Sequence, residues 1–221
     1  MNDTMIQLAL DTHDLEFAKK VAFYAAESGF DIIEVGTPMI KRYGAGVVAD
    51  IKRLISGRAK VLADLKILDA SSLEIESAVL NGAEIVTVMG LAYDETLREA
   101  LENARSYNIE IWADLMYIDD PYERSRRLID LGFDTVILHI GVDVQKRRRV
   151  SADMLEREVE KISSEGLRVA VAGGLDPYKA LKVVERGASI IIMGGWIIRS
   201  DKWQERIAEA FNVLKRGSKW R

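Results

Sequence analysis

Short runs of apolar residues, rich in Val, Ile and Leu, recur along the whole chain at nearly regular intervals. Their first residues lie 21 to 33 positions apart, which leaves room in each interval for a strand, two short loops and one helix. Continuous apolar runs of this length are typical of strands that are buried on both faces. The pattern predicts eight strands, at residues 5–11, 31–37, 61–67, 85–90, 109–116, 135–141, 168–174 and 189–195.

The segments between these runs have the periodicity of amphipathic helices. In residues 15–29, apolar side chains recur at helical spacing, and Gly29 follows as a C-terminal helix stop. Residues 94–108 and 178–188 repeat the design. Four similar junctions lead from a helix into the next strand, and they read ESGFDII, NGAEIV, DLGFDTV and ERGASII. One structural unit is therefore repeated along the chain.

Buried strands that alternate with helices predict a parallel sheet covered by helices, and eight such units predict an α/β protein with the (β/α)8 TIM-barrel fold. A doubly wound open sheet is the alternative, but its first turn is Gly-rich, whereas the first turn here reads LALDTHDLE. No linker or low-complexity segment divides the sequence. We therefore expect a single barrel domain over residues 1–221.

Composition narrows the class of function. The 221 residues carry a formal net charge of −4, which argues against a nucleic-acid partner. The absence of cysteine excludes disulfides and thiolate metal sites. No apolar run reaches the length of a membrane span, and the first residues lack a signal-peptide layout. We expect a cytoplasmic protein that acts on small molecules and has no membrane partner.

Charged side chains gather where the predicted strands end, and in a barrel these ends meet at one mouth where chemistry is found. The stretch ADLKILDA (63–70) has Asp64 and Lys66 on the same face of a strand and Asp69 in the following loop. A buried ion pair would explain one such pair, and a lone strand-end carboxylate is more often a cap. Several strands end in this way, however, which favours a functional site made of Asp11, Glu34, Asp64, Lys66, Asp114 and His139.

Carboxylates without cysteine, and with few histidines, suit a hard cation that takes oxygen ligands, most simply Mg²⁺. Glu34 and Asp64 come from neighbouring predicted strands and are the natural ligand pair. The other histidine, His13, lies in the first loop and is interpreted as a surface residue.

The last two predicted strands each end in Gly-Gly before a helix, at Gly173–Gly174 and Gly194–Gly195. Paired glycines let backbone N–H groups approach an anion, and a helix N-terminus adds favourable partial charge. Two such turns at adjacent strand ends predict a phosphate site rather than two tight turns, with Arg199 in support. The basic run at 145–150 is interpreted as a solvated loop face.

These residues resemble those of a known family. IQLALD, EVGTPMI, KVLADLKILDA, GAEIVTVMG, ILHIGVD and AVAGG, in this order, resemble 3-hexulose-6-phosphate synthases of the orotidine 5'-monophosphate decarboxylase superfamily. The most specific motifs are EVGTP and the Asp-x-Lys-x-x-Asp of Asp64, Lys66 and Asp69. Orotidine monophosphate decarboxylases carry a lysine where this chain has Glu34. The resemblance covers most of the chain and thins after residue 195.

The resemblance implies a lyase that reversibly condenses formaldehyde with D-ribulose 5-phosphate to D-arabino-3-hexulose 6-phosphate, in the ribulose monophosphate pathway. It implies Mg²⁺ on Glu34 and Asp64, which stabilises an enediolate intermediate. Lys66 would add a fixed positive charge, and His139 would move the proton at carbon 1. Asp11 and Asp69 would hold substrate hydroxyls and orient Lys66.

The resemblance also implies a homodimer in which Asp69 reaches into the partner's site. The sequence agrees, because apolar residues lie around Asp69 near the mouth and are expected to be exposed: Leu68, Leu73 and Ile75. The alternative is that Asp69 caps the following helix. Two other functions stay open, a sugar-phosphate or orotidine 5'-phosphate decarboxylase on the same scaffold and a barrel that binds a sugar phosphate without turnover. The decarboxylases of keto-gulonate 6-phosphate usually read His-Arg-Gly after strand 6, where this chain reads His139-Ile140-Gly141.

Overall fold

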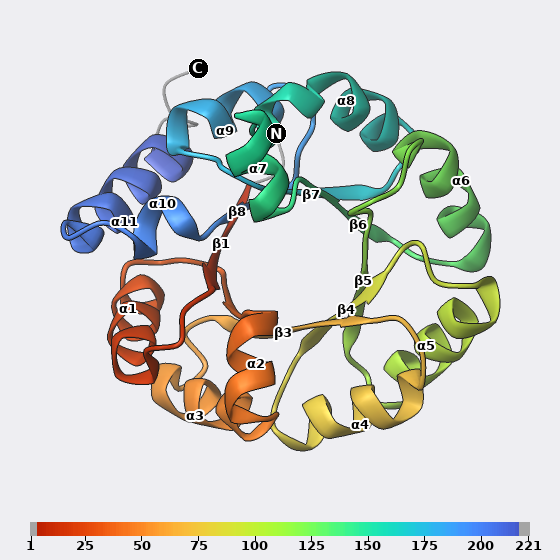
Figure 1. The fold of residues 1–221 in the computed structure, drawn as a ribbon, viewed down its shortest axis with the longest axis horizontal. Helices are drawn as coiled ribbons and strands as arrows, with labels where there is room; N and C mark the ends of the chain where they lie inside the picture. The colour runs from red at the N-terminus through yellow and green to blue at the C-terminus, as the bar shows by residue number, and fades with distance from the viewer. Residues whose placement is uncertain (1–3, 217–221) are drawn as a thin grey trace.

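The computed structural model describes residues 4–216, and these form a closed (β/α)8 barrel. The parallel strands follow one another around the ring in chain order, and β8 pairs with β1 to close it. Figure 1 looks into the barrel and shows the helices as an outer ring. The predicted fold and all eight predicted strands are confirmed. The strands are β1 Met5–Leu10, β2 Ile32–Val35, β3 Lys60–Ile67, β4 Ile85–Met89, β5 Glu110–Asp114, β6 Thr135–His139, β7 Arg168–Ala172 and β8 Ile190–Met193.

All the strands except β3 end one or two residues before their predicted limits. At β2 and β8 the next helix begins within the predicted strand, because Thr37 already opens α2 and Gly195 opens α10. The α-helices are α1 Leu15–Glu27, α2 Thr37–Tyr43, α3 Gly46–Ile55, α4 Ser71–Leu80, α5 Asp94–Ser106, α6 Pro121–Leu131, α7 Val142–Arg148, α8 Glu156–Ser164, α9 Pro177–Val184, α10 Gly195–Ile198 and α11 Trp203–Phe211. A 3-10 turn, η1 Ala152–Leu155, precedes α8, and a π-helical turn, η2 Asn212–Arg216, follows α11.

The first helix illustrates how local sequence sets these bounds. Asp14 precedes α1, and its carboxylate accepts a hydrogen bond from the backbone N–H of Phe17, which satisfies one of the free donors of the first turn. The apolar stripe of the helix is buried against the sheet. Gly29 follows with φ of 93°, a left-handed conformation that glycine adopts without steric cost. The predicted helix and its stop at Gly29 are confirmed.

Each strand alternates between two apolar layers. In β1, Ile6, Leu8 and Leu10 face outward and pack against the helices. The inward positions belong to a smaller cluster on the barrel axis, in which Ala9 and the fully buried Trp112 take part. Side chains therefore fill the barrel, and the only direction in which the inward residues can reach solvent is along its axis.

The N-terminal end of the barrel carries a group of opposite charges. The Glu110 carboxylate accepts hydrogen bonds from Lys60 Nζ at 2.6 Å, from Arg168 at 2.5 Å and from the Trp112 indole at 3.1 Å. Burial opposes ionisation of Glu110, but these donors outweigh it and lower the pKa of the carboxyl to about 2. Because β3, β5 and β7 supply the charges, this group ties together strands that are not neighbours in the ring.

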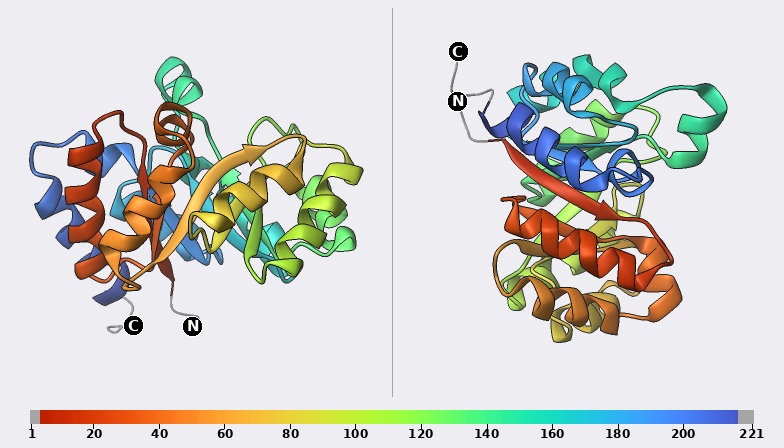
Figure 2. Two further views of the ribbon diagram at one scale, coloured as in Figure 1. Left: turned by 90° about the horizontal axis from the view of Figure 1, so that it is seen from below. Right: turned by 90° about the vertical axis from the view of Figure 1, so that its left-hand side faces the viewer.

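The other end of the barrel is the functional end in this fold class. Figure 2 shows α2 and α7 projecting beyond the strands on this side, on opposite sides of the opening seen in Figure 1. None of the helices in the described part of the chain combines the length and the apolar character that a membrane span requires.

Candidate active site

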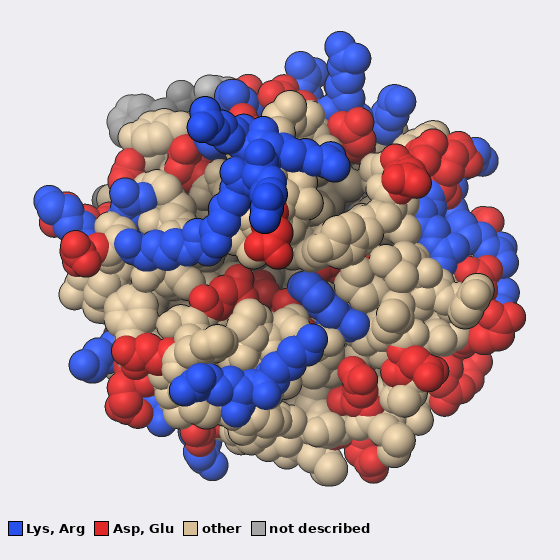
Figure 3. Space-filling model, viewed as in Figure 1, with Lys and Arg blue, Asp and Glu red and all other residues tan. Residues whose placement is uncertain are grey.

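A cavity of about 640 Å³ opens at the C-terminal ends of the strands. Figure 3 shows acidic side chains in the hollow at the centre of this face and basic side chains over α7 beside it. Of the residues predicted from the sequence to form the site, all but Asp69 line this cavity: Asp11, Glu34, Asp64, Lys66, Asp114, His139, Gly173, Gly174, Gly194 and Gly195. Arg199 lines it as well.

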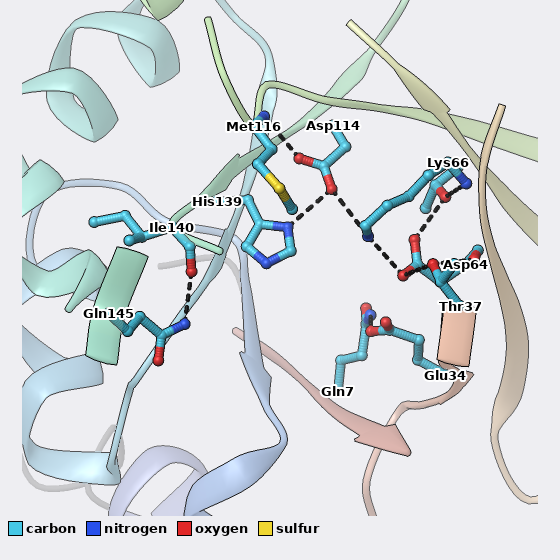
Figure 4. Close-up of polar contacts among 11 residues, drawn as sticks. Gln7, Glu34, Thr37, Asp64, Lys66, Asp114, Met116, His139, Ile140 and Gln145 are labelled. Carbon is cyan, nitrogen blue, oxygen red and sulfur yellow. Dashed lines mark hydrogen bonds and ion pairs between the residues drawn. The ribbon is translucent and has the colours of Figure 1, made fainter. Parts of the chain in front are cut away.

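Asp64 and Lys66 form the predicted ion pair, with Lys66 Nζ 2.6 Å from Asp64 Oδ2 (Figure 4). The backbone between them is not a regular strand, because the register between β3 and β4 shifts between Ala63 and Ile67. Lys66 itself has φ of 50°, in the left-handed region that costs energy for any residue with a Cβ. The irregularity directs the lysine side chain over the cavity. Regular alternation along a strand predicted the pairing but not this backbone.

Two threonines hold this strained segment. Thr87 Oγ1 on β4 accepts a hydrogen bond from the backbone N–H of Lys66 at 3.0 Å and donates one to Asp64 Oδ1 at 2.8 Å. Thr37 Oγ1 at the start of α2 lies 2.7 Å from Asp64 Oδ2 and 2.6 Å from the Asp64 carbonyl oxygen. The Asp64 carboxylate is therefore fixed by two hydroxyls and one ammonium group, so its position does not depend on solvent.

Asp114 joins the lysine to the histidine. Its Oδ2 lies 3.3 Å from Lys66 Nζ and 2.8 Å from His139 Nδ1, and its Oδ1 accepts from the backbone N–H of Met116. The side chain is buried, and burial alone would raise its pKa, but the His139 and Lys66 charges and these hydrogen bonds outweigh burial and lower the pKa of Asp114. Asp114 is one of the strand-end residues that the sequence places in the functional site, and it lines the cavity. Its contacts with Lys66 and His139 agree with that placement and not with a lone helix cap.

Among the described residues, only one ring nitrogen of His139 has a hydrogen-bond partner. Because Nδ1 contacts Asp114, the other nitrogen, Nε2, points away from that carboxylate toward the cavity (Figure 4). A carboxylate on Nδ1 fixes the orientation and the tautomer of an imidazole. The arrangement suits a group that takes up and returns a proton at Nε2.

Glu34 on β2 is a buried carboxylate, and it accepts a hydrogen bond from Gln7 Nε2 at 2.6 Å. Burial and the negative charges of Asp64 and Asp11 raise the pKa of the Glu34 carboxyl well above its usual value, against the opposing effect of Lys66. Burial and Asp64 likewise raise the pKa of Asp11, although solvent reaches this residue at the mouth. Three carboxylates therefore repel one another here.

The charge balance bears on the predicted Mg²⁺. Burial opposes the positive charge of Lys66, but Asp64, Asp114 and Glu34 outweigh burial and raise the pKa of the lysine. A single ammonium group leaves an excess of negative charge, which a divalent cation would offset. Among the described residues no cluster of three or more His, Asp or Glu side chains has metal-holding geometry. Glu34 and Asp64 fit a cation such as Mg²⁺, which takes one or two carboxylates and completes its shell with water and substrate.

The two Gly-Gly turns differ from each other. Gly173 and Gly174 have φ of 122° and 69°, and a Cβ on Gly173 would come within 2.5 Å of the Ile140 carbonyl oxygen, so glycine is needed there for the turn itself. The helix that follows, α9, is not open to an anion, because the Asp176 carboxylate accepts from its first backbone N–H groups. The expectation that both turns lead directly into a free helix end is therefore wrong for β7.

At the turn after β8, no side chain of the described part of the chain caps the start of α10. Arg199 lies over this turn, and its Cζ would be 3.2 Å from a Cβ at Gly195. A positive side chain and uncapped backbone N–H groups thus face the same part of the cavity. This is the better of the two predicted phosphate positions.

Asp69 lies outside the cavity of its own chain. The residue is exposed, and no hydrogen bond or ion pair holds its side chain within residues 4–216. The cap position of α4 is Ala70, with φ of 50° and no side-chain hydrogen bond, so the alternative that Asp69 caps this helix is wrong. Leu68 and Leu73 beside it are 53% and 68% exposed, as expected. Ile75 is fully buried, contrary to expectation, because it lies on the inner face of α4.

Other sequence predictions concern residues around the mouth of the cavity. His13 is exposed, in agreement with its interpretation as a surface residue. The basic run forms the exposed end of α7, whereas Gln145 within it lines the cavity and donates to the Ile140 carbonyl oxygen at 2.6 Å. Gln7, Thr37 and Thr87 also line the cavity and were not predicted. The signal for Gln7 and Thr87 was a polar residue at an inward position of an otherwise apolar strand.

Comparison with known proteins adds independent information. Residues 4–210 match the model of the orotidine 5'-phosphate decarboxylase / HUMPS family. The chain is 34% identical over 209 residues to 3-hexulose-6-phosphate synthase 2 of Staphylococcus saprophyticus, covering 95% of this chain and 96% of that protein. It is 35% identical over 196 residues to 3-hexulose-6-phosphate synthase of Staphylococcus haemolyticus, covering 89% and 91%.

A solved structure agrees with these relatives. The crystal structure of 3-hexulose-6-phosphate synthase from Salmonella typhimurium superposes with a TM-score of 0.89 at 29% identity, covering 96% of this chain and 99% of that one. The likeness extends over the whole barrel, so the strand ends that form the cavity belong to the shared fold.

The crowding of carboxylates predicts that Glu34 destabilises the metal-free protein. A carboxyl whose pKa is raised in the native state costs stability above that raised pKa, and the cost disappears as the pH falls to the unfolded-state value of about 4.3. Glu34→Gln should therefore raise the melting temperature at about pH 8, by roughly 2–4 °C for each kcal/mol, and lose that advantage in acid. Calorimetry in the presence of a chelator measures the difference.

The matched control is Glu110→Gln. The pKa of Glu110 is lowered to about 2, so its ionised form stabilises the native state above the unfolded-state pKa. This variant should melt at a lower temperature than wild type at neutral pH. A Glu34→Gln protein that is also less stable at neutral pH would contradict the repulsion described here.

Proposed function

Because the chain belongs to the orotidine 5'-phosphate decarboxylase / HUMPS family, we propose that it catalyses the reversible aldol condensation of formaldehyde with D-ribulose 5-phosphate to D-arabino-3-hexulose 6-phosphate. The observation that carries the proposal is the continuous contact from Asp64 through Lys66 and Asp114 to His139 along one wall of the cavity. It joins a fixed cation to a group that can transfer protons. The relatives named 3-hexulose-6-phosphate synthase cover nearly the whole chain.

The reaction begins with removal of a proton from carbon 1 of the ketose, which leaves an enediolate. We assign this proton to His139 Nε2, the ring nitrogen that faces the cavity. Carbon 1 then forms the new bond to the carbon of formaldehyde. The formaldehyde oxygen takes up one proton, which balances the proton removed from carbon 1, and becomes a hydroxyl group. Asp114 keeps the imidazole in one orientation throughout.

Lys66 stabilises the negative charge of the enediolate. Its ammonium group is held between Asp64 and Asp114, so it need not reorganise as the charge develops. Its raised pKa keeps it protonated throughout the working pH range. Asp11, at the mouth, is proposed to bind substrate hydroxyls.

Mg²⁺ is the proposed cofactor, with Glu34 and Asp64 as its protein ligands. When bound, it would supply a Lewis acid for the ketose oxygens. The support is the oxygen donor set of the two carboxylates and the excess of negative charge, which together with burial raises the pKa of Glu34.

The phosphate group is proposed to bind at the turn after β8, with the backbone of Gly194 and Gly195 and the Arg199 guanidinium, and with Gly173 and Gly174 forming the adjacent wall. The support is the uncapped start of α10 and the position of Arg199 above it. This end of the cavity lies apart from Asp64, because β8 and β3 are separated by β1 and β2.

Two further proposals concern the assembly and its compartment. We infer a homodimer, because no hydrogen bond or ion pair holds Asp69 within the described part of the chain and exposed leucines flank it. In such a dimer Asp69 would reach the partner's cavity. The protein is proposed to act in the cytoplasm, in the ribulose monophosphate pathway.

The first test of the proposed function is an assay with three substrates. Ribulose 5-phosphate plus formaldehyde and Mg²⁺ should give hexulose 6-phosphate, whereas keto-gulonate 6-phosphate and orotidine monophosphate should react slowly or not at all. A chelator should abolish turnover, and Mg²⁺ should restore it. Two carboxylates alone do not complete the oxygen shell of the cation, so a chelator can compete for it. Full activity in excess chelator would refute the metal proposal, and faster decarboxylation of either other substrate would favour a decarboxylase. No turnover of any of the three would favour the binding-only alternative.

Substitution of Lys66 tests the role of the fixed charge. Lys66→Met should lower kcat by a factor on the order of 10² or more, since one preorganised charge-stabilising group typically contributes that much. Steady-state kinetics measure the effect, and circular dichroism checks the fold. Lys146→Met, at an exposed position on α7, is the control and should keep kcat. Near-normal kcat in Lys66→Met would identify the lysine as a structural ion-pair partner.

Substitution of Arg199 tests the phosphate position. Arg199→Met should raise KM for ribulose 5-phosphate by about tenfold and change kcat little. The reason is that the charge-assisted contact to the phosphate is lost equally in the bound ground state and in the transition state. The matched comparison is ribulose, which lacks the phosphate and should react equally poorly with both proteins. An unchanged KM for the phosphorylated substrate would refute the assignment. Gly194→Val is a poorer probe, because a Cβ there lies 3.2 Å from Ala9 and would disturb the barrel itself.

Mixing two inactive variants tests the shared site. Asp69→Ala and Asp64→Ala should each be inactive as homodimers, whereas a hybrid dimer has one site with both lesions and one with neither. Random exchange should restore about a quarter of wild-type activity if the sites act independently. Differently tagged subunits verify the exchange. Confirmed hybrids without activity would mean that Asp69 acts within its own chain.

A further inference from the structure

Gln7 is a polar residue in the apolar interior of the barrel. It lies on β1, where its backbone pairs with Ile32 of β2 and Ile192 of β8. Its side chain points inward and is 0% exposed, and the neighbouring inward positions belong to the apolar cluster on the barrel axis. An apolar side chain at this position would match its surroundings, so packing alone does not explain the presence of an amide.

The amide of Gln7 has only one hydrogen bond. Nε2 donates to Glu34 Oε2 at 2.6 Å, while the carbonyl oxygen Oε1 is buried and has no partner among the described residues. A buried polar atom without a partner costs stability, so the residue is not explained by packing. The contact with Glu34 is the feature that explains why a glutamine is present despite this cost.

The contact fixes how Glu34 presents its two oxygens. Oε2 is occupied by the amide, and within residues 4–216 no hydrogen bond is made to Oε1. Figure 4 shows the Gln7 amide against the Glu34 carboxylate, beside Asp64. With Oε2 held by the amide, Oε1 is the Glu34 oxygen that is left free for a ligand.

We propose that Gln7 is a positioning residue for the divalent cation: its amide holds Glu34 so that one carboxylate oxygen faces Asp64 as a ligand. The inference rests on the cation site of the proposed function and deepens it. A partner that orients a ligating carboxylate typically changes metal affinity by a factor of about 10 to 100, which is large enough to measure directly.

The test is Mn²⁺ binding to the metal-free protein, followed by the electron paramagnetic resonance signal of free Mn²⁺ and by competition with Mg²⁺. Gln7→Met keeps the length of the side chain and removes the donor. It should lower the affinity for Mn²⁺ by about tenfold or more. Without metal its melting temperature should equal or exceed that of wild type, because the unpaired carbonyl oxygen is gone.

Thr135→Val is the matched control. Thr135 is also a fully buried polar residue in a strand, at the other end of the barrel, where its hydroxyl donates to Asp134 at 2.7 Å. This variant should bind Mn²⁺ like wild type. If Gln7→Met binds Mn²⁺ as tightly as wild type, the inference is overturned.

Glu34→Gln separates this failure from failure of the proposed cation site. Weak binding by Glu34→Gln together with normal binding by Gln7→Met overturns the role of Gln7 alone. Wild-type affinity in Glu34→Gln, or no binding by wild type, overturns the cation site and the inference with it.

A second measurement uses the unmodified residue, in case Gln7→Met does not fold. The chain has three glutamines, at positions 7, 145 and 204, so selective ¹⁵N labelling gives three side-chain NH₂ signals. Substitution of Gln145 and Gln204 assigns two of them and leaves the third to Gln7. Mg²⁺ should shift the Gln7 signal strongly. A Gln7 signal that does not move while Mg²⁺ saturates the protein would overturn the proposal.

Discussion

The structure depends on one unfavourable interaction, the repulsion among the carboxylates of Asp11, Glu34 and Asp64 at the mouth of the barrel. Water would normally relieve such repulsion, but Glu34 and Asp64 are buried. Lys66 supplies a positive charge between Asp64 and Asp114, and its position requires a left-handed backbone at residue 66. Threonine hydroxyls from α2 and β4 then hold the segment. Together these features compensate for the concentration of negative charge at the mouth and hold the charged side chains in place.

The rest of the barrel offsets the free-energy cost of this arrangement. Two apolar layers surround the strands, and the group of charges around Glu110 at the opposite end is paired by hydrogen bonds. The contrast between Glu110 and Glu34 is informative, since both are barrel carboxylates on strands. Donors lower the pKa of Glu110 against the effect of burial, whereas burial and like charges raise the pKa of Glu34. Ionised groups at the N-terminal end of the barrel stabilise the fold. Those at the C-terminal ends of the strands, where the cavity lies, destabilise it.

Periodicity and strand-end chemistry predicted the barrel, its eight strands and most cavity residues, because both depend on residue spacing within a single strand or helix. What they missed depends on the distance between strands. The contacts of Asp114 with Lys66 and His139 arise because β5 lies beside β6 and within reach of β3. Asp176 closes the end of α9, which Gly-Gly spacing alone cannot reveal. Ile75 faces inward because it shares the buried face of α4 with Ser71 and Ala78. The spacing of residue types along the chain does not predict such contacts between elements.

The order of strands around the ring also orders the chemistry. The three repelling carboxylates come from the ends of β1, β2 and β3, the Asp114–His139 pair from β5 and β6, and the glycine turns from β7 and β8. A sugar phosphate anchored by its phosphate at β8 would extend across the mouth, with its carbonyl end toward Lys66 and Asp64. His139 would then meet carbon 1 from the side opposite β2. In this proposed arrangement the phosphate and the developing enediolate, both negative, would lie at separate cations, Arg199 and Lys66, so neither charge would be stabilised at the expense of the other.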